Sequence, residues 1–518
     1  MSTLVSLSIL PNELENTDYI LKAALKKAAI NPANVADWRI RKRSIDARKK
    51  PVKMQLQVEI WERGDLRESL SKFESKDVSN APTIAIIGAG PAGLYAALRA
   101  IEAGLKPIVF ERGKDVKARR RDLAKINKEQ IVNPESNYCF GEGGAGTYSD
   151  GKLYTRSKKR GNDLKALEWL VHFGADEDIL VDAHPHIGTN KLPKLITAMR
   201  EAIEEAGGVV HFDSKLTDLI IEDNKVKGLE INNEIQYDFK EVILATGHSA
   251  RDIFYLLHAK NIKLEAKPFA LGVRIEHQQE VINYIQYHGE TDNPYLPPAA
   301  YSLVVQIDGM GVYSFCMCPG GIIAPCATAQ DEVVTNGWSP SKRNNPYANS
   351  GIVVSVTPED LPNYKPDDPL VCLNFQKEVE HACWIAGGRT QQVPAQRMTD
   401  FVNGVKSKDF PKTSYQPGIV SADLNKVLPD LIAKRLKKAF VAFGKKMPGY
   451  LSKDAVLHAP ESRTSSPISI PRNSETLEQV EISGLYPCGE GAGYAGGIMS
   501  AAIDGINCVD AIAKKYAL

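Results

Sequence analysis

Residues 83–93 read TIAIIGAGPAG, and this stretch decides the fold that the chain is expected to adopt. The run TIAII is apolar almost throughout, which is typical of a strand buried within a parallel sheet. Gly88, Gly90 and Gly93 follow with GxGxxG spacing and open a helix that ends at Gly104. In such a turn the three glycines permit the tight bend, the close approach of a pyrophosphate and the packing of helix on strand. A dinucleotide site is therefore predicted here.

The start of this helix and the strand that follows it extend the predicted site. Pro91 and Ala92 lie at the helix N-terminus, where backbone N–H groups favour phosphate charge. Residues 105–113 predict a second parallel strand, which completes a right-handed βαβ unit. Glu111 ends that strand and is expected to accept hydrogen bonds from a ribose. Arg112 is expected to face the pyrophosphate or adenine, with an ordinary surface arginine as the alternative.

A second signal lies near the other end of the chain, where residues 484–506 read GLYPCGEGAGYAGGIMSAAIDGI. A strand is expected to end at Cys488, followed by a glycine-rich turn and a helix. An acidic residue after a glycine suits the hydroxyl groups of a flavin ribityl chain. The positive N-terminus of the helix would stabilise a reduced flavin. The cofactor contacts expected from this stretch are Gly489, Glu490, Gly496, Gly497 and Ile498.

A third signal supports the C-terminal one, which decides between the two cofactors, FAD and NAD, that share the first motif. Thr246 and Gly247 follow an apolar strand and are expected beside the adenosine half. A dehydrogenase that uses NAD alone has no need of the C-terminal signal, so the predicted cofactor is FAD. The middle of the chain lacks a second GxGxxG motif, which argues against a full NAD domain. The electron donor is then either NAD(P)H bound transiently against the flavin or another protein.

Together these motifs resemble the glutathione-reductase-like FAD-binding flavoproteins in the broad sense. Three longer strings are similar to a family of bacterial FAD-dependent dehydrogenases whose substrate is not assigned. They are FGEGGAGTYSDGKL at 140–153, PGGIIAPCAT with NGWSP within 319–340, and ESRTSSPISIPRN at 461–473. The resemblance covers nearly the whole chain. It implies FAD and supplies no reaction.

The expected fold class is α/β, with a three-layer Rossmann-like FAD-binding domain, an inserted β-rich substrate domain and a small N-terminal α+β domain. The N-terminal unit predicts the order β-α-β-β. Residues 424–443 predict a helix within the inserted domain. The expected boundaries are 1–75 for the N-terminal unit, 82–265 and 456–518 for the two parts of the FAD-binding domain, and 266–455 for the insertion.

Residues for substrate chemistry are less clearly indicated. Gly144 and Ala145 form a side-chain-poor loop that suits phosphate or a flavin ring. Lys152 is a catalytic candidate that would place a positive charge near flavin N1 or a substrate anion, with a solvated lysine as the alternative. Glu461 and Arg463 are candidates for binding a polar substrate. A structural ion pair is the alternative for both.

The eight cysteines are scattered and form no CxxC motif. Cys316 and Cys318 are expected on one face of a strand, where packing explains them better than a metal, so no metal site is predicted. Cys488 has no CxxC partner, which disfavours a disulfide reductase. Reduced thiols and the absence of a signal-peptide pattern at the N-terminus predict a cytoplasmic protein.

The net charge of +1 demands neither nucleic acid nor a membrane surface. The leading hypothesis is an FAD-dependent oxidoreductase acting on a small organic molecule. Residues 39–53 carry eight basic residues and one acidic residue, which keeps open an RNA-modifying or RNA-associated flavoprotein. An electron-transfer flavoprotein that docks a protein partner through this run is a further alternative. The oligomeric state is not indicated.

Overall fold

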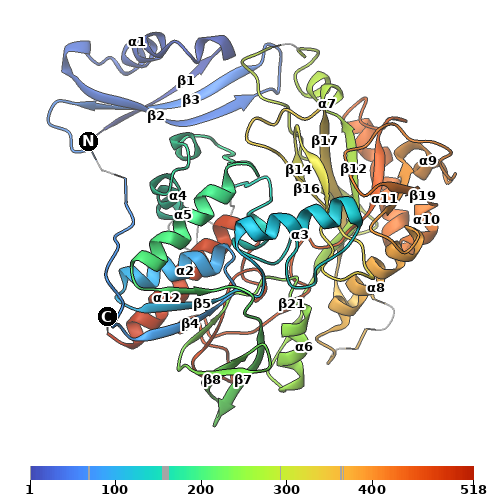
Figure 1. Ribbon diagram of the computed structural model, residues 1–518. Coiled ribbons are helices and arrows are strands. Elements are labelled where there is room, and N and C mark those ends of the chain that lie inside the picture. The colour runs from blue at the N-terminus through green and yellow to red at the C-terminus, as the bar shows by residue number, and fades with distance from the viewer. Residues whose placement is uncertain are drawn as a thin grey trace.

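The computed structural model describes residues 2–67, 70–154, 163–291, 293–361, 364–365 and 367–517. The N-terminal unit is a three-stranded antiparallel sheet in the order β1-β3-β2, which lies at the top in Figure 1. Alternate residues of β3 are buried against one side of α1, as the period-2 pattern predicts. Its elements are β1 (Thr3–Ile9), α1 (Thr17–Ala28), β2 (Val35–Asp46) and β3 (Lys53–Glu62).

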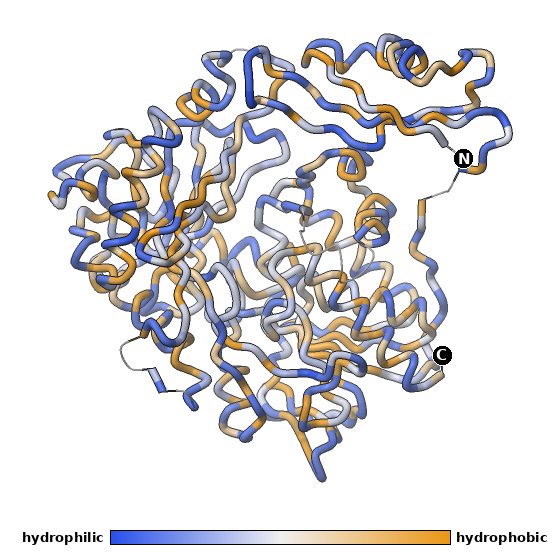
Figure 2. Tube along the Cα trace, turned by 180° about the vertical axis from the view of Figure 1, so that it is seen from behind, coloured by the Kyte–Doolittle hydropathy of each residue, from blue (hydrophilic) through white to orange (hydrophobic). Residues whose placement is uncertain are grey.

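A parallel five-stranded sheet forms the second unit, in the order β22-β10-β4-β5-β6. Helices cover one face and a small antiparallel sheet covers the other, which gives three layers. Apolar residues follow the strands between these layers (Figure 2). The strands are β4 (Thr83–Ile87), β5 (Lys106–Phe110), β6 (Val209–His211), β10 (Val242–Leu244) and β22 (Leu485–Pro487). The covering elements are α2 (Pro91–Glu102), α4 (Asp163–His172), α5 (Leu192–Glu205), α12 (Ile498–Lys515), β7 (Leu216–Glu222), β8 (Lys225–Ile231) and β9 (Ile235–Asp238).

The topology of this sheet brings the three predicted signals together. The loops after β4, β10 and β22 begin at the same edge, because the carboxyl ends of adjacent parallel strands meet there. Two further helices flank that edge, and α3 crosses the front of the molecule in Figure 1. They are α3 (Val116–Glu129) and α6 (Arg251–Ala259).

A seven-stranded sheet forms the third unit, in the order β13-β14-β17-β12-β20-β18-β19. Neighbouring strands are antiparallel except β18 and β19. The strands are β12 (Phe269–Gln278), β13 (Val304–Ile307), β14 (Met310–Cys318), β17 (Tyr347–Val356), β18 (Val393–Arg397), β19 (Ile419–Ser421) and β20 (Val456–Glu461). The remaining elements around it are α7 (Gln279–Gln286), α8 (Val371–Ala386), α9 (Met398–Asn403), α10 (Leu424–Val427), α11 (Asp430–Lys446) and the short strands β11 (Glu265–Ala266), β15 (Ile322–Pro325), β16 (Thr335–Trp338) and β21 (Ile468–Ser469).

The unit built on the seven-stranded sheet differs from the sequence prediction in three places. Strand β20 pairs with both β12 and β18, so the sheet extends to Glu461 and beyond the expected boundary at residue 455. The helix expected at 424–443 is two helices, because Pro429 precedes the first turn of α11 and separates it from α10. Helix α8 lies in a segment that was expected to be strands and loops.

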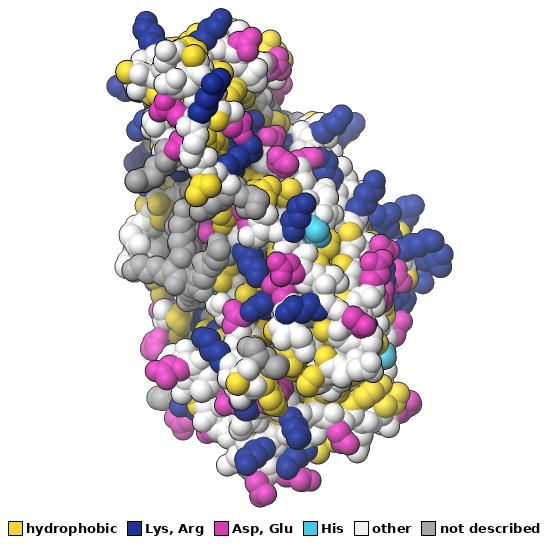
Figure 3. Space-filling model, turned by 90° about the vertical axis from the view of Figure 1, so that its left-hand side faces the viewer, with side chains coloured by type: hydrophobic (Ala, Val, Ile, Leu, Met, Phe, Trp, Pro, Cys, Tyr) yellow, Lys and Arg dark blue, Asp and Glu magenta, His cyan; other side chains and the backbone are white. Residues whose placement is uncertain are grey.

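Three of the eight basic residues in the run 39–53 form ion pairs with acidic side chains. Arg39 pairs with Glu59, Arg48 with Asp46, and Arg43 with Asp178 and Asp182. The face of this unit in Figure 3 accordingly shows basic and acidic side chains interspersed. These ion pairs lower, but do not remove, the positive charge that a phosphate backbone would meet on this unit. Across the described ranges, no helix has the length and apolar character that a bilayer crossing requires.

A buried carboxyl in β12 gives the fold a testable pH dependence. Glu276 is 3% exposed and accepts hydrogen bonds from the backbone N–H and the hydroxyl of Ser414. Burial raises the pKa of Glu276 to about 7. Because the folded state binds this proton more tightly than the unfolded state, the protonated carboxyl makes its full contribution to stability below the ordinary carboxyl pKa. That contribution is lost as the pH rises through 7.

We therefore expect the change Glu276→Gln to be more favourable for stability at pH 8 than at pH 5. The free energy of unfolding of the variant minus that of the parent should rise by about 2–3 kcal/mol between pH 5 and pH 8, since one pKa unit is worth about 1.4 kcal/mol. Denaturant unfolding at the two pH values measures this difference. A difference that does not change with pH would contradict the buried, neutral state of Glu276.

Candidate active site

A cavity of about 270 Å³ connects the carboxyl edge of the parallel sheet with the seven-stranded sheet. Residues from all three sequence signals and from the inserted unit contribute to its wall. Three predicted site residues lie outside that wall, namely Gly93, Gly496 and Glu461. The predicted residues that line it are Gly88, Gly90, Pro91, Ala92, Glu111, Arg112, Gly144, Ala145, Lys152, Thr246, Gly247, Arg463, Gly489, Glu490, Gly497 and Ile498.

The glycines of the first motif have different surroundings. A Cβ at Gly93 would lie 1.9 Å from the carbonyl oxygen of Gly88, and a Cβ at Gly88 would lie 2.5 Å from that of Ala245. These two positions are glycine because backbone packs on backbone. A Cβ at Gly90 would meet no described atom of another segment closer than the Cα of Gly144, at 3.9 Å. The protein's own packing therefore does not require glycine at position 90, which faces the cavity.

Glu111 is held at one end of the cavity by backbone groups. Its carboxylate is 5% exposed and accepts hydrogen bonds from the N–H groups of Ala89, Gly113 and Gly141 at 2.8–2.9 Å. A carboxylate has about four acceptor positions, so one remains for a ligand hydroxyl. The same contacts fix the glycine turn of residues 88–90 against the end of β5.

The neighbouring Arg112 is engaged within the protein. Its guanidinium donates to both carboxylate oxygens of Asp252 at 2.9 Å and to Glu135 at 2.7 Å. It also lies over the ring of Phe140, 4.3 Å from the centroid. With its charge compensated by two carboxylates, Arg112 serves to build the wall at the Glu111 end. A direct ion pair with a pyrophosphate is not favoured.

Glu490 connects the C-terminal glycine turn to the start of α12. Its carboxylate accepts a hydrogen bond from the N–H of Gly497 at 2.5 Å, and burial raises its pKa to about 7. His248 lies 3.7 Å away, and burial lowers the pKa of this imidazole to about 4, so it is neutral at pH 7. The buried Nδ1 of His248 has no hydrogen-bond partner among the described residues. Gly497 has φ of +116°, a conformation that only glycine adopts readily.

Lys152 provides a positive charge at the end of the cavity near the inserted sheet. Its Nζ lies 3.2 Å from Oδ2 of Asp150 and 3.5 Å from Sγ of Cys318. Burial opposes its charge, but Cys318 and Asp150 keep the pKa of Lys152 above its ordinary value. Burial also opposes ionisation of Asp150, but Lys152 and Arg343 hold the pKa of Asp150 below its ordinary value. Both side chains are therefore charged at neutral pH.

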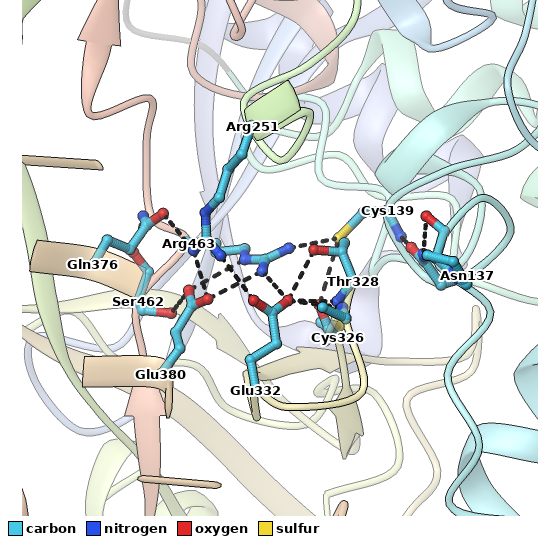
Figure 4. Close-up of polar contacts among 12 residues, drawn as sticks. Asn137, Cys139, Arg251, Cys326, Thr328, Glu332, Gln376, Glu380, Ser462 and Arg463 are labelled. Atoms are coloured by element: carbon cyan, nitrogen blue, oxygen red, sulfur yellow. Dashed lines mark hydrogen bonds and ion pairs between the residues drawn. The ribbon is translucent and has the colours of Figure 1, made fainter. Parts of the chain in front are cut away.

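Arg463 belongs to a buried network of two arginines and two glutamates beside the cavity (Figure 4). Arg463 contacts Glu332 at 2.5 Å and Glu380 at 3.1 Å, and Arg251 contacts the same two carboxylates at 2.7 and 2.6 Å. The hydroxyl of Ser462 also donates to Glu380, at 2.6 Å. Although burial opposes ionisation, the arginines hold the pKa of Glu332 below its ordinary value. The network is neutral as a whole, which favours a structural role for Arg463.

Glu461 does not reach the cavity. Both of its oxygens accept hydrogen bonds from Arg274 of β12, at 2.7 and 2.9 Å, and the two side chains are 2% and 0% exposed. Glu461 is thus in a structural ion pair, but its partner is Arg274 and not Arg463, the partner considered from the sequence. Its partner Arg274 was not singled out from the sequence. The two residues are far apart in the chain and meet because β12 and β20 are neighbours.

Three segments of the chain match known family models. Residues 82–280 match the family model of pyridine nucleotide-disulphide oxidoreductases, and residues 268–464 match that of FAD-dependent protein, C-terminal domain-like. Residues 1–61 match a domain of unknown function. An uncharacterised protein of Clostridium beijerinckii is 38% identical over an alignment of 526 residues, and this alignment covers 97% of each chain.

The chain belongs to the family of this clostridial protein. With its two matched flavoprotein domains, it is an FAD-dependent oxidoreductase. A probable fumarate reductase, Ifc3 of Shewanella frigidimarina, is 26% identical over 211 residues, or 36% of each chain. The flavin-dependent brominase Bmp2 has a TM-score of 0.37 at 13% identity, with 84% of this chain and 79% of that chain covered.

The cavity of this FAD-dependent oxidoreductase fits the cofactor in several respects. Position 90 is open on the cavity side, and Glu111 retains one acceptor position for a hydroxyl. The buried Nδ1 of His248 and the buried Oδ1 of Asp150 have no partner among the described residues, although both side chains line the cavity. Buried polar atoms are normally paired, so these two indicate that a polar ligand completes the site.

The cysteines of β14 differ from the sequence prediction. The pairing of β14 with β17 shifts between Phe315 and Cys318, and Cys316 has φ of +44°. Simple alternation along a strand therefore does not apply here. Cys316 is exposed and Cys318 is buried, and both line the cavity. The predicted packing role therefore suits the buried Cys318 but not the exposed Cys316.

Another cysteine pair was not foreseen, because its members come from different elements. Cys488 and Cys508 lie within 4.8 Å of one another and of a carboxylate oxygen of Asp504. That carboxylate is already held by Arg472, at 2.6 and 3.0 Å, and by the N–H of Gly489. An arginine thus supplies the positive charge that a metal ion would supply.

Proposed function

We propose that FAD occupies this cavity and that the seven-stranded unit selects a small organic substrate at its far end. Gly88, Gly90 and the N-terminus of α2 would hold the pyrophosphate, and Glu111 the adenosine ribose. Thr246 and Gly247 would border the adenosine half. The residues that would hold the flavin half are Gly144, Ala145, Gly489, Glu490, Gly497 and Ile498. Bound FAD supplies hydride or electron transfer, and the protein supplies binding and orientation.

One observation carries the proposal. A single cavity runs from Glu111, at the end of β5, to Lys152 and the β14 strand of the inserted unit. The cofactor signals and the side chains of the inserted unit therefore border the same space. This is the arrangement that a substrate needs in order to meet a cofactor held by the parallel sheet.

Two of the alternative functions, RNA binding and docking of a protein partner, have less support. The ion pairs of Arg39, Arg43 and Arg48 reduce the free positive charge that RNA binding or docking of an acidic partner would use. NAD(P)H as a transient electron donor stays a prediction, as does the cytoplasmic location. Stopped-flow mixing of the oxidised enzyme with NADH and with NADPH distinguishes a nucleotide donor from a protein donor.

The cofactor test is the flavin that the purified protein releases on denaturation. We expect FAD in about equal amount to protein, because the Gly88–Ala92 turn and Glu111 are suited to an adenosine diphosphate half that FMN lacks. Chromatography of the released flavin measures both identity and amount. Recovery of FMN, or of no flavin from a folded preparation supplied with FAD, would contradict the proposal.

A further inference from the structure

We infer that the substrate carries a carboxylate and that Lys152 and Asn336 bind it at the inserted-unit end of the cavity. The inference rests on the proposed function and adds the substrate class to it. Three observations support it, namely the free donors of Lys152, the net charge around it and the fixed orientation of Asn336.

Lys152 has hydrogen-bonding capacity that its described neighbours do not use. An ammonium group has three N–H donors. Among the described residues, Asp150 takes one at 3.2 Å and the thiol of Cys318 accepts a weak one at 3.5 Å. The Lys152 side chain is 35% exposed and lines the cavity, so at least one donor remains for a ligand.

The charges around Lys152 leave this end of the cavity positive. In the part of the chain that the structure describes, Asp150 is the one carboxylate paired with these two cations, Lys152 at 3.2 Å and Arg343 at 3.4 Å. Burial lowers the pKa of the nearby His186, which is therefore neutral at pH 7. The other arginines described beside the cavity are balanced by carboxylates, as in the pair of Arg274 with Glu461. A cavity end with one uncompensated positive charge attracts an anion.

Asn336 adds a second donor with a defined direction. Its Oδ1 accepts hydrogen bonds from Nη2 of Arg274 at 3.3 Å and from the N–H of Gly337 at 2.7 Å. These two donors identify the oxygen of the amide, so the Nδ2 group is the one left for a ligand. Asn336 and Gly337 both line the cavity.

The buried ion pair behind Asn336 fixes its orientation. Glu461 holds Arg274 through two hydrogen bonds, and Arg274 in turn holds the oxygen of Asn336. Arg274 and Glu461 are therefore positioning residues for a substrate that they do not touch.

Arg274 also donates to the backbone oxygen of Cys316. Cys316 lies two residues before Cys318, which contacts Lys152. Lys152 and Asn336 therefore border the same part of the cavity. An ammonium and an amide donor placed in this way suit the two oxygens of a carboxylate.

The test is a titration of the FAD-loaded enzyme with small mono- and dicarboxylic acids and with the matched amide of each. Perturbation of the visible flavin absorption reports binding. We expect at least one acid to bind, and its amide to bind at least about tenfold more weakly, since a hydrogen bond to a charged group is worth more than one to a neutral group. If no acid in the panel perturbs the flavin, or if amides bind as tightly as acids, the inference is wrong.

Variants identify the residues responsible. Lys152→Met and Asn336→Asp should each weaken acid binding at least about tenfold, whereas Lys152→Arg should retain it, because it keeps the charge. Lys434→Met, which removes an exposed lysine paired with Asp430 on α11, is the control for net charge and should bind acids like the parent. Unchanged acid binding in Lys152→Met would overturn the assignment. FAD content is measured first in each case, so that loss of cofactor is distinguished from loss of anion binding.

Discussion

Replacement of Gly90 by alanine is expected to weaken FAD binding strongly and to leave the fold of the protein intact. Gly90 has φ of −74°, which alanine adopts without strain, and a Cβ would meet no described atom of another segment closer than 3.9 Å. The added methyl group would instead enter the space assigned to the pyrophosphate. Overpacking costs about 1–3 kcal/mol, so affinity for FAD should fall roughly ten- to hundredfold.

Two other glycines provide the controls for this experiment. Gly93→Ala should destabilise the apoprotein itself, because its Cβ would lie 1.9 Å from a backbone oxygen that cannot move aside. Gly496→Ala should have little effect on either property, since Gly496 lies outside the cavity wall and a Cβ there would meet no described atom within 4 Å. The measurements are the Kd of each apoprotein for FAD and its unfolding midpoint. An affinity of Gly90→Ala for FAD equal to that of the parent would show that the cofactor does not approach this turn.

Replacement of Arg463 by methionine is expected to destabilise the protein by about 3–5 kcal/mol, the usual cost of removing one partner from a buried ion pair. Arg463 and Arg251 together balance Glu332 and Glu380, whose side chains are 4% and 0% exposed. Without Arg463 the network would hold an uncompensated negative charge away from water. The free energy of unfolding by denaturant measures the loss.

The matched control for this variant is Arg48→Met. Arg48 also pairs with a carboxylate, that of Asp46, but its side chain is 87% exposed. Exposed ion pairs contribute about 0–1 kcal/mol, so this change should be nearly neutral. If both variants lose the same small amount, the Arg463 network is not the structural centre that its burial indicates.

The parts of the site that follow from local sequence could be predicted. The glycine turn after β4, the acidic end of β5 and the start of α12 at Ile498 each depend on neighbouring residues in the chain. Their spacing reflects the geometry of one strand, one turn and one helix, which a motif records directly. Their meeting at one edge follows from parallel pairing of the strands.

The parts that depend on distant pairing could not be predicted. Arg274 lies in none of the quoted motifs, and the NGWSP string that contains Asn336 indicates no role for this residue. The importance of both appears only when β12, β16 and β20 lie together. The bulge that turns Cys316 into the cavity arises from a shift in the pairing of β14 with β17, which strand alternation does not reveal. The extension of the inserted sheet to Glu461 has the same origin.

The most direct test of the central claim is a crystal structure of the FAD-loaded enzyme. We predict that the adenosine ribose lies within hydrogen-bonding distance of Glu111 and that the pyrophosphate lies at Gly90 and the N-terminus of α2. The flavin ring should lie beside Gly497 and Ile498, facing Lys152 and β14. A flavin bound elsewhere, or bound in the reverse direction with its ring at Glu111, would contradict the account.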